Sequence, residues 1–99
     1  MSFVQIVEYT TSRPDEMRAL GEEFAASRQG SSGPGNVVVY KDRDAEDRYV
    51  VIAKFGSYEE AMANSSAPET QEFADRMAAL CDGPPTFRNL DEHWVSVQD

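Results

Sequence analysis

His93 and Trp94 are the neighbouring residues of this sequence that are best suited to chemistry. An imidazole titrates near neutral pH and can take a proton from a substrate, and an indole ring can stack on a planar ligand. Neighbours on a strand point to opposite faces, so both residues line one pocket only where the strand bulges. The competing and more common arrangement is a surface or interface histidine beside a core tryptophan.

Glu8 is a second candidate, because it shares one strand face with Val4 and Ile6 and is therefore expected to be partly buried. A carboxylate in such a place needs a partner. Arg88 or Lys54 is the partner expected across the sheet. A structural ion pair is favoured over a catalytic role for this residue.

The sequence offers no set of metal ligands, and no metal or cofactor is predicted. Cys81 and His93 are the only cysteine and histidine, which excludes a standard zinc site within one chain. The acidic connector at 42–48 resembles a calcium loop only superficially. Asp47 stands where the turn needs glycine, and Ala53 stands where the last bidentate glutamate belongs.

The composition fits one domain over residues 1–99 and argues against several partners. The net charge is −9, and the nine Lys and Arg residues form no cluster, so nucleic acid and anionic membranes are not expected partners. No apolar run approaches the roughly 20 residues that span a bilayer. The start of the chain has no basic segment typical of a signal peptide. We therefore expect a cytoplasmic protein.

Four strands are predicted from alternating or β-branched residues, at 3–9, 37–40, 49–55 and 86–97. The short connector at 42–48 favours an antiparallel hairpin between the second and third strands. The last strand is expected to be strongest at its end, residues 94–97. Both faces of the first and third strands are mostly apolar.

Two helical regions separate these strands. The first has Ser12 as an expected cap and Pro14 in its first turn, and it should end near residue 28, before a loop at 29–35. Gly21 lies on its apolar stripe and is expected to let this helix approach the sheet closely. The second region should break into two pieces, capped by Ser57 and Ser66, and should stop at Asp82-Gly83.

The order strand, helix, hairpin, helix, strand predicts an α+β, ferredoxin-like β-α-β-β-α-β domain. Its four-stranded antiparallel sheet would carry helices on one face only. Because strands 3–9 and 49–55 are apolar on both faces, the uncovered face should meet a second copy of the chain. The alternative is that these extra apolar residues are scattered over the surface.

The run Lys54-Phe55-Gly56-Ser57-Tyr58-Glu59-Glu60-Ala61, followed by Asn64 and Ser66-Ala67-Pro68-Glu69, resembles the dimeric α/β-barrel superfamily. Within it, the chain is similar to antibiotic-biosynthesis-monooxygenase-like proteins. The resemblance implies two sheets that close into a barrel between subunits, with a cavity between each sheet and its own helices. Some such proteins oxygenate aromatic polyketides without metal or flavin, and others degrade haem or bind small ligands.

The sequence departs from the active subgroups at several positions. Phe55 stands where many members have tryptophan, and Asn64 stands near the place where many have histidine. Haem-degrading relatives share an Asn, Trp and His set, but His93 is the only histidine here and lies on the last predicted strand. Haem degradation is therefore not expected.

These observations lead to three functional hypotheses. In the first, a homodimer binds a small aromatic or planar molecule, and cofactor-independent oxidation is the reaction considered. His93, Glu8 and Asn64 are weak catalytic candidates, and the expected pocket walls are Phe24, Phe55, Tyr58, Met62, Phe73, Met77 and Trp94. In the second, the protein is a non-catalytic binding or interaction module, and in the third it is a purely structural dimer. The sequence does not choose between them.

Overall fold

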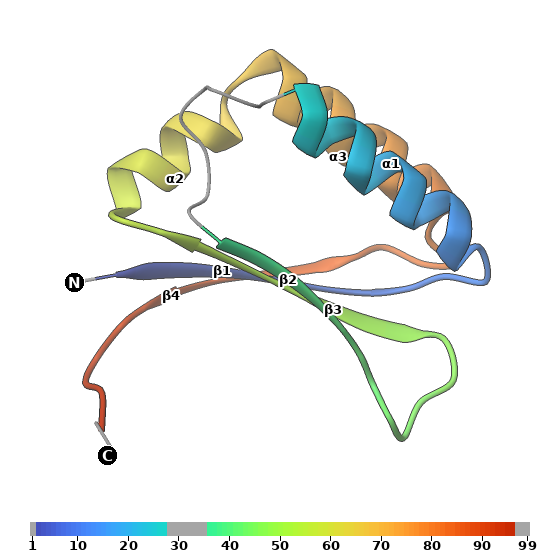
Figure 1. The fold of residues 1–99 in the computed structure, drawn as a ribbon, viewed down its shortest axis with the longest axis horizontal. Coiled ribbons are helices and arrows are strands. Elements are labelled where there is room, and N and C mark those ends of the chain that lie inside the picture. Colours follow the sequence, from blue (N-terminus) through green and yellow to red (C-terminus); the bar gives the residue numbers. More distant parts are fainter. Residues whose placement is uncertain (1, 28–35, 97–99) are drawn as a thin grey trace.

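The computed structural model describes residues 2–27 and 36–96. Three helices lie on one side of a four-stranded sheet and leave the other side open (Figure 1). The elements are β1 (Phe3–Thr10), α1 (Pro14–Ser27), β2 (Asn36–Lys41), β3 (Arg48–Phe55), α2 (Tyr58–Ser65), α3 (Pro68–Leu80) and β4 (Thr86–Asp91). The strands are antiparallel in the order β2-β3-β1-β4. The predicted ferredoxin-like fold is confirmed, while the loop at 29–35 lies outside the described residues.

The pairing register sorts the side chains of the sheet into two faces. Phe3 pairs with Phe55 and Val7 with Val51, and because side chains alternate along a strand, these residues share the face under the helices. Ile6 pairs with Ile52, which in turn pairs with Val38, on the opposite face. A row of aliphatic side chains therefore runs across β2, β3 and β1 on the open face of the sheet, and Arg88 continues it on β4.

The corner between β1 and α1 is held by Thr11, which is only 1% exposed. Its hydroxyl donates to the Leu80 carbonyl (2.6 Å) and accepts from the Arg13 N–H (3.0 Å). The hydroxyl of Ser12, the expected cap, instead donates to the Asp82 carboxylate (3.2 Å). This corner joins the end of β1 to the end of α3.

The break between α2 and α3 is present, but only one of the two predicted caps forms. Ser57 accepts the N–H of Glu60 through its hydroxyl (3.1 Å) and caps α2. Ser66 does not cap α3, because it ends α2 and its hydroxyl donates back to the Met62 carbonyl (3.0 Å). Ala67 takes the N-cap position of α3 without a side-chain hydrogen bond.

The last strand is shorter than the sequence suggests, and the emphasis on its end was wrong. Phe3 at the start of β1 pairs with Asp91, and the N–H of Glu92 still donates to the Ser2 carbonyl (2.9 Å). Residues beyond Glu92 have no described strand residue opposite them. Trp94 consequently lies outside the sheet and is 74% exposed. Val97, the predicted end of the strand, lies outside the described residues.

The core consists of two clusters at opposite ends of β1. One joins Tyr9 to Met17, Leu20 and Met77, while the other joins Phe3 to Phe55 and Ala61. The middle of β1 belongs to neither buried cluster, so the space above it is filled less completely. No helix in the described part of the chain is long and apolar enough to cross a membrane.

Candidate ligand-binding cavity

A cavity of about 450 Å³ lies between the sheet and the helices. Its volume is within the range of roughly 300–1,000 Å³ typical of small-molecule sites. All four strands contribute to its floor, with Val7, Val51, Ala53 and Phe87 among them. The helices α1, α2 and α3 supply its roof. The cavity therefore occupies the gap between the two core clusters.

Two stacked rings form part of the roof. Phe24 of α1 and Phe73 of α3 lie with their ring centroids 4.4 Å apart and their planes 17° apart. Both rings line the cavity, and so does Met77 one turn after Phe73. The roof thus offers aromatic and sulfur-containing surface of the kind that suits a planar apolar ligand.

The structure brings together four of the seven residues that the sequence suggested as pocket walls. Phe24, Phe55, Phe73 and Met77 line the cavity, whereas Tyr58, Met62 and Trp94 do not. This corrects the assignment of the last three residues. Tyr58 is 52% exposed and packs edge-on against Phe3, at a centroid distance of 5.5 Å.

The other two corrections have simple causes. Met62 on α2 packs against the cluster of Phe3, Phe55 and Ala61 instead of lining the cavity. Trp94 lies beyond the end of β4 and is exposed. The sequence therefore placed part of the pocket wall at positions on α2 and beyond the end of β4 whose side chains do not reach the cavity.

Asn64 is the one candidate catalytic residue that lines the cavity. Its Oδ1 is buried and has no hydrogen-bond partner in the described part of the protein. A buried acceptor without a partner costs about 1–3 kcal/mol, so such atoms mark places where a further donor belongs. A ligand hydroxyl or N–H entering the cavity would satisfy it.

The other two catalytic candidates lie elsewhere. His93 is exposed in the segment beyond β4, away from the cavity lining. Glu8 lies on the open face of the sheet, where its Oε2 is 3.8 Å from the Arg88 Nη2. The ion pair expected for Glu8 is therefore present with Arg88, and neither His93 nor Glu8 can touch a molecule bound in the cavity.

The polar groups of the cavity are neutral. Gln5, Tyr9, Asn64 and Thr70 line it, and no charged side chain is among the described residues that do so. Burial, and then the neighbouring Cys81 and Tyr49, raise the pKa of Tyr9 above its ordinary value. Tyr9 therefore stays a phenol at neutral pH, able to exchange hydrogen bonds but not to act as a phenolate base.

Gly21 is a cavity residue whose role the sequence did not reveal. It was expected to allow close packing of α1 on the sheet, and that expectation is wrong. No atom of the described residues lies within 4 Å of the position that a Cβ at Gly21 would occupy. Its helical neighbours Met17, Phe24 and Ala25 also line the cavity, so Gly21 lies on the inner face of α1.

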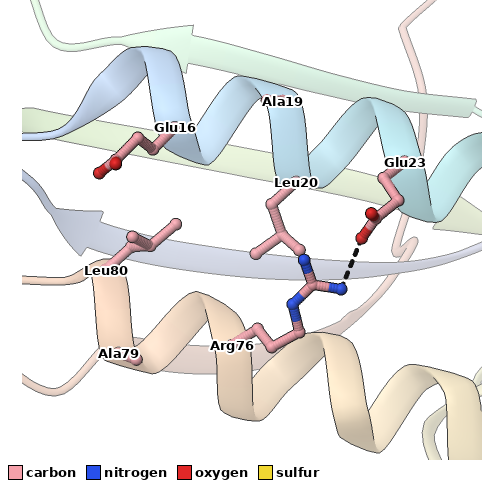
Figure 2. A pocket seen from close by; sticks show the side chains of 7 residues that line it. All are labelled: Glu16, Ala19, Leu20, Glu23, Arg76, Ala79 and Leu80. Carbon is pink, nitrogen blue, oxygen red and sulfur yellow. Dashed lines mark hydrogen bonds and ion pairs between the residues drawn. The ribbon is translucent and has the colours of Figure 1, made fainter.

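A second hollow of about 420 Å³ lies between α1 and α3 on the side turned away from the sheet. Ala19, Leu20, Ala79 and Leu80 line it, and Figure 2 shows Leu20 pointing from α1 toward α3 and an ion pair between Arg76 and Glu23 that bridges the two helices. The Arg76 and Glu23 side chains are about half exposed. This outer groove therefore encloses a ligand far less completely than the inner cavity.

No protein-family model matches the sequence, and no curated protein matches it either. Solved structures are similar in fold. SnoaB, a cofactor-independent oxygenase from Streptomyces nogalater, is 18% identical with a TM-score of 0.78, and the match covers 95% of each chain.

Two further structures extend this likeness. Rv0793 from Mycobacterium tuberculosis is 16% identical with a TM-score of 0.77, and the match covers 98% of this chain and 100% of that one. A protein from Caulobacter crescentus that carries the name antibiotic biosynthesis monooxygenase is 14% identical with a TM-score of 0.78, covering 98% and 91% of the two chains. The fold is thus that of the antibiotic-biosynthesis-monooxygenase-like proteins.

Proposed function

We propose that this protein binds a planar, hydroxylated aromatic molecule in the cavity between its sheet and its helices, and that it oxidises this molecule with O₂ without a cofactor. The observation that carries the proposal is the buried Oδ1 of Asn64, which has no hydrogen-bond partner among the described residues and lies in a mainly apolar cavity without charged side chains in its described lining. That atom requires a donor, and the surrounding rings favour an aromatic molecule to supply it.

The proposed reaction needs little from the protein beyond binding. A substrate with an acidic methylene group between two aromatic rings ionises through its enol form, whose hydroxyl donates to the Asn64 Oδ1. The resulting carbanion reduces O₂, one oxygen atom becomes the new carbonyl, and the other leaves as water with the two methylene hydrogens. The name of SnoaB, a cofactor-independent oxygenase of the same fold, supports this choice of reaction.

A second candidate is a binding protein without catalysis. It is favoured by one observation, namely that none of the described residues lining the cavity is a carboxylate, an imidazole or an amine. The cavity thus lacks a side chain that takes a proton at neutral pH, and ionisation would depend on the substrate itself. Under this alternative the same aromatic molecule binds and is released unchanged.

The proposal includes a homodimer built on the open face of the sheet. Val4, Ile6, Val38, Val50 and Ile52 lie on that face, and Figure 1 shows that no helix covers it. An aliphatic patch of this kind, bordered by the Glu8–Arg88 ion pair, is rarely left exposed on a soluble protein. A second copy brings the same surface and can cover it by two-fold symmetry.

The test uses anthrone, which has an acidic methylene group between two rings. Purified protein is mixed with anthrone in an oxygen electrode, and its thermal unfolding is recorded with anthrone under nitrogen. We expect oxygen uptake above the buffer rate at one O₂ per anthrone, a raised midpoint of unfolding, and a lower uptake rate with Asn64→Ala. A raised midpoint without oxygen uptake would support the binding protein, and neither effect would overturn both candidates.

A further inference from the structure

Gly21 stands in the interior of a 14-residue helix without a local reason to be glycine. Glycine is the least favourable helix residue after proline, so a glycine at the eighth position of α1 weakens the helix. Its backbone is helical and open to any residue type. A glycine in such a place usually has a reason in packing or in function.

Packing does not supply that reason. At Gly56, a Cβ would lie 2.8 Å from the Glu60 Oε2, which accepts the Gly56 N–H, so a side chain there would have to displace the end of the Glu60 side chain. At Gly21, by contrast, the Cβ position has no neighbour within 4 Å in the part of the chain that the structure describes. The empty space beside Gly21 is the cavity itself, because the residue belongs to its lining.

The geometry points to Gly21 as the residue that sets the upper size limit of the ligand. The bare backbone of α1 at Gly21 leaves room for a further fused ring beside Phe24, and any side chain would occupy that room. This inference rests on the proposed function, because it concerns the ligand of the same cavity. It adds the position on α1 that admits the third fused ring of a ligand such as anthrone.

The experiment compares two probes that share a hydroxyl group and differ by one ring, 1-naphthol and 9-phenanthrol. Dissociation constants are measured for the unaltered protein, Gly21→Ala and Gly21→Leu. We expect Gly21→Leu to weaken 9-phenanthrol binding at least tenfold and 1-naphthol binding less than threefold. Ala19→Leu is the matched control, because Ala19 lies on the same helix but lines the outer groove (Figure 2). It should leave both constants unchanged.

Gly21→Ala supplies a second readout that needs no ligand. If glycine serves the cavity and not the fold, alanine should raise the midpoint of thermal unfolding by about 4 °C or more, since it favours the helix. A lowered midpoint would overturn the inference by giving Gly21 a structural role. An equal loss of affinity for both probes with Gly21→Leu, or no loss of affinity for either, would also overturn the inference and leave the proposed function intact. Failure of the unaltered protein to bind either probe would overturn both.

Discussion

The stacked rings of Phe24 and Phe73, with centroids 4.4 Å apart, tie α1 to α3 directly above the cavity. The two residues are 49 positions apart in the sequence, so the stack forms only when both helices are in place. Each ring also presents surface to the cavity. One contact therefore serves both the packing of the helical layer and the shape of the proposed site.

The first prediction concerns the energy of this stack. Aromatic pairs contribute about 0.5–1.5 kcal/mol beyond the area that each ring buries. A double-mutant cycle with Phe24→Leu, Phe73→Leu and the double variant should therefore give a coupling energy of about 1 kcal/mol, measured by urea unfolding. Strictly additive losses in the free energy of unfolding would show that the two rings do not stabilise each other.

Much of the fold could be predicted because local signals and the global order agree. Pro14 and Pro68 mark helix starts, Ser57 caps α2, and the apolar strands at 3–9 and 49–55 pair as neighbours. Predictions from local sequence fail where tertiary structure determines the conformation. Ser66 has the spacing of a cap but completes the last turn of α2 instead.

The candidate site was predicted less well, for a physical reason. Phe24, Phe73 and Met77 lie on periodic apolar stripes, and such stripes identify the residues that face inward. Periodicity does not show whether an inward face meets other side chains or empty space. Gly21 was for this reason assigned to close packing, although it borders the cavity. Trp94 was misplaced because the length of β4 depends on where β1 begins.

The second prediction concerns the stability cost of Asn64. In the absence of ligand, Asn64→Leu should not lower the free energy of unfolding and is expected to raise it by up to about 1 kcal/mol. The substitution removes a buried acceptor that has no partner among the described residues, and it improves helix propensity. Chemical denaturation is measured without and with 9-phenanthrol, so that the effect of the substitution on the free protein is separated from its effect on ligand binding. A loss of more than about 1 kcal/mol without ligand would mean that the amide has a structural role.

The third prediction concerns alkaline pH. Burial is the main cause that raises the pKa of both Tyr9 and Cys81, so the folded protein keeps these protons longer than the unfolded chain does. Stability from this source is fully present below the unfolded pKa values, about 8.5 for Cys and about 10 for Tyr. It is lost as the pH rises through the folded values, because the unfolded state then binds fewer protons.

Tyr9→Phe should accordingly flatten the fall in the free energy of unfolding between about pH 9 and pH 11, and urea titrations across this interval measure the slope. Tyr58→Phe is the matched control, because Tyr58 is 52% exposed and the change removes a hydroxyl from the surface. The Tyr58 variant should keep the slope of the unaltered protein. The assignment fails if both variants change the slope equally.

The last prediction concerns the open face of the sheet. Ile52 of β3 lies at the centre of this face, between Ile6 of β1 and Val38 of β2. A carboxylate at position 52 would lose its hydration in an interface between two copies. The free energy of this desolvation exceeds the free energy that the buried apolar surface around it contributes. We expect the unaltered protein to sediment as a dimer at micromolar concentration, and Ile52→Asp to give monomers or insoluble protein.

Val39→Asp is the control for this prediction. Val39 lies on β2 beside Val38 but on the helix-side face, and it is 56% exposed. The change therefore introduces the same charge and the same loss of β-propensity without touching the open face, and it should leave the dimer intact. Dissociation by both variants would point to general destabilisation of the sheet. A native monomer for the unaltered protein would remove the dimer from the proposal, while leaving the cavity, which lies within one chain, available for ligand.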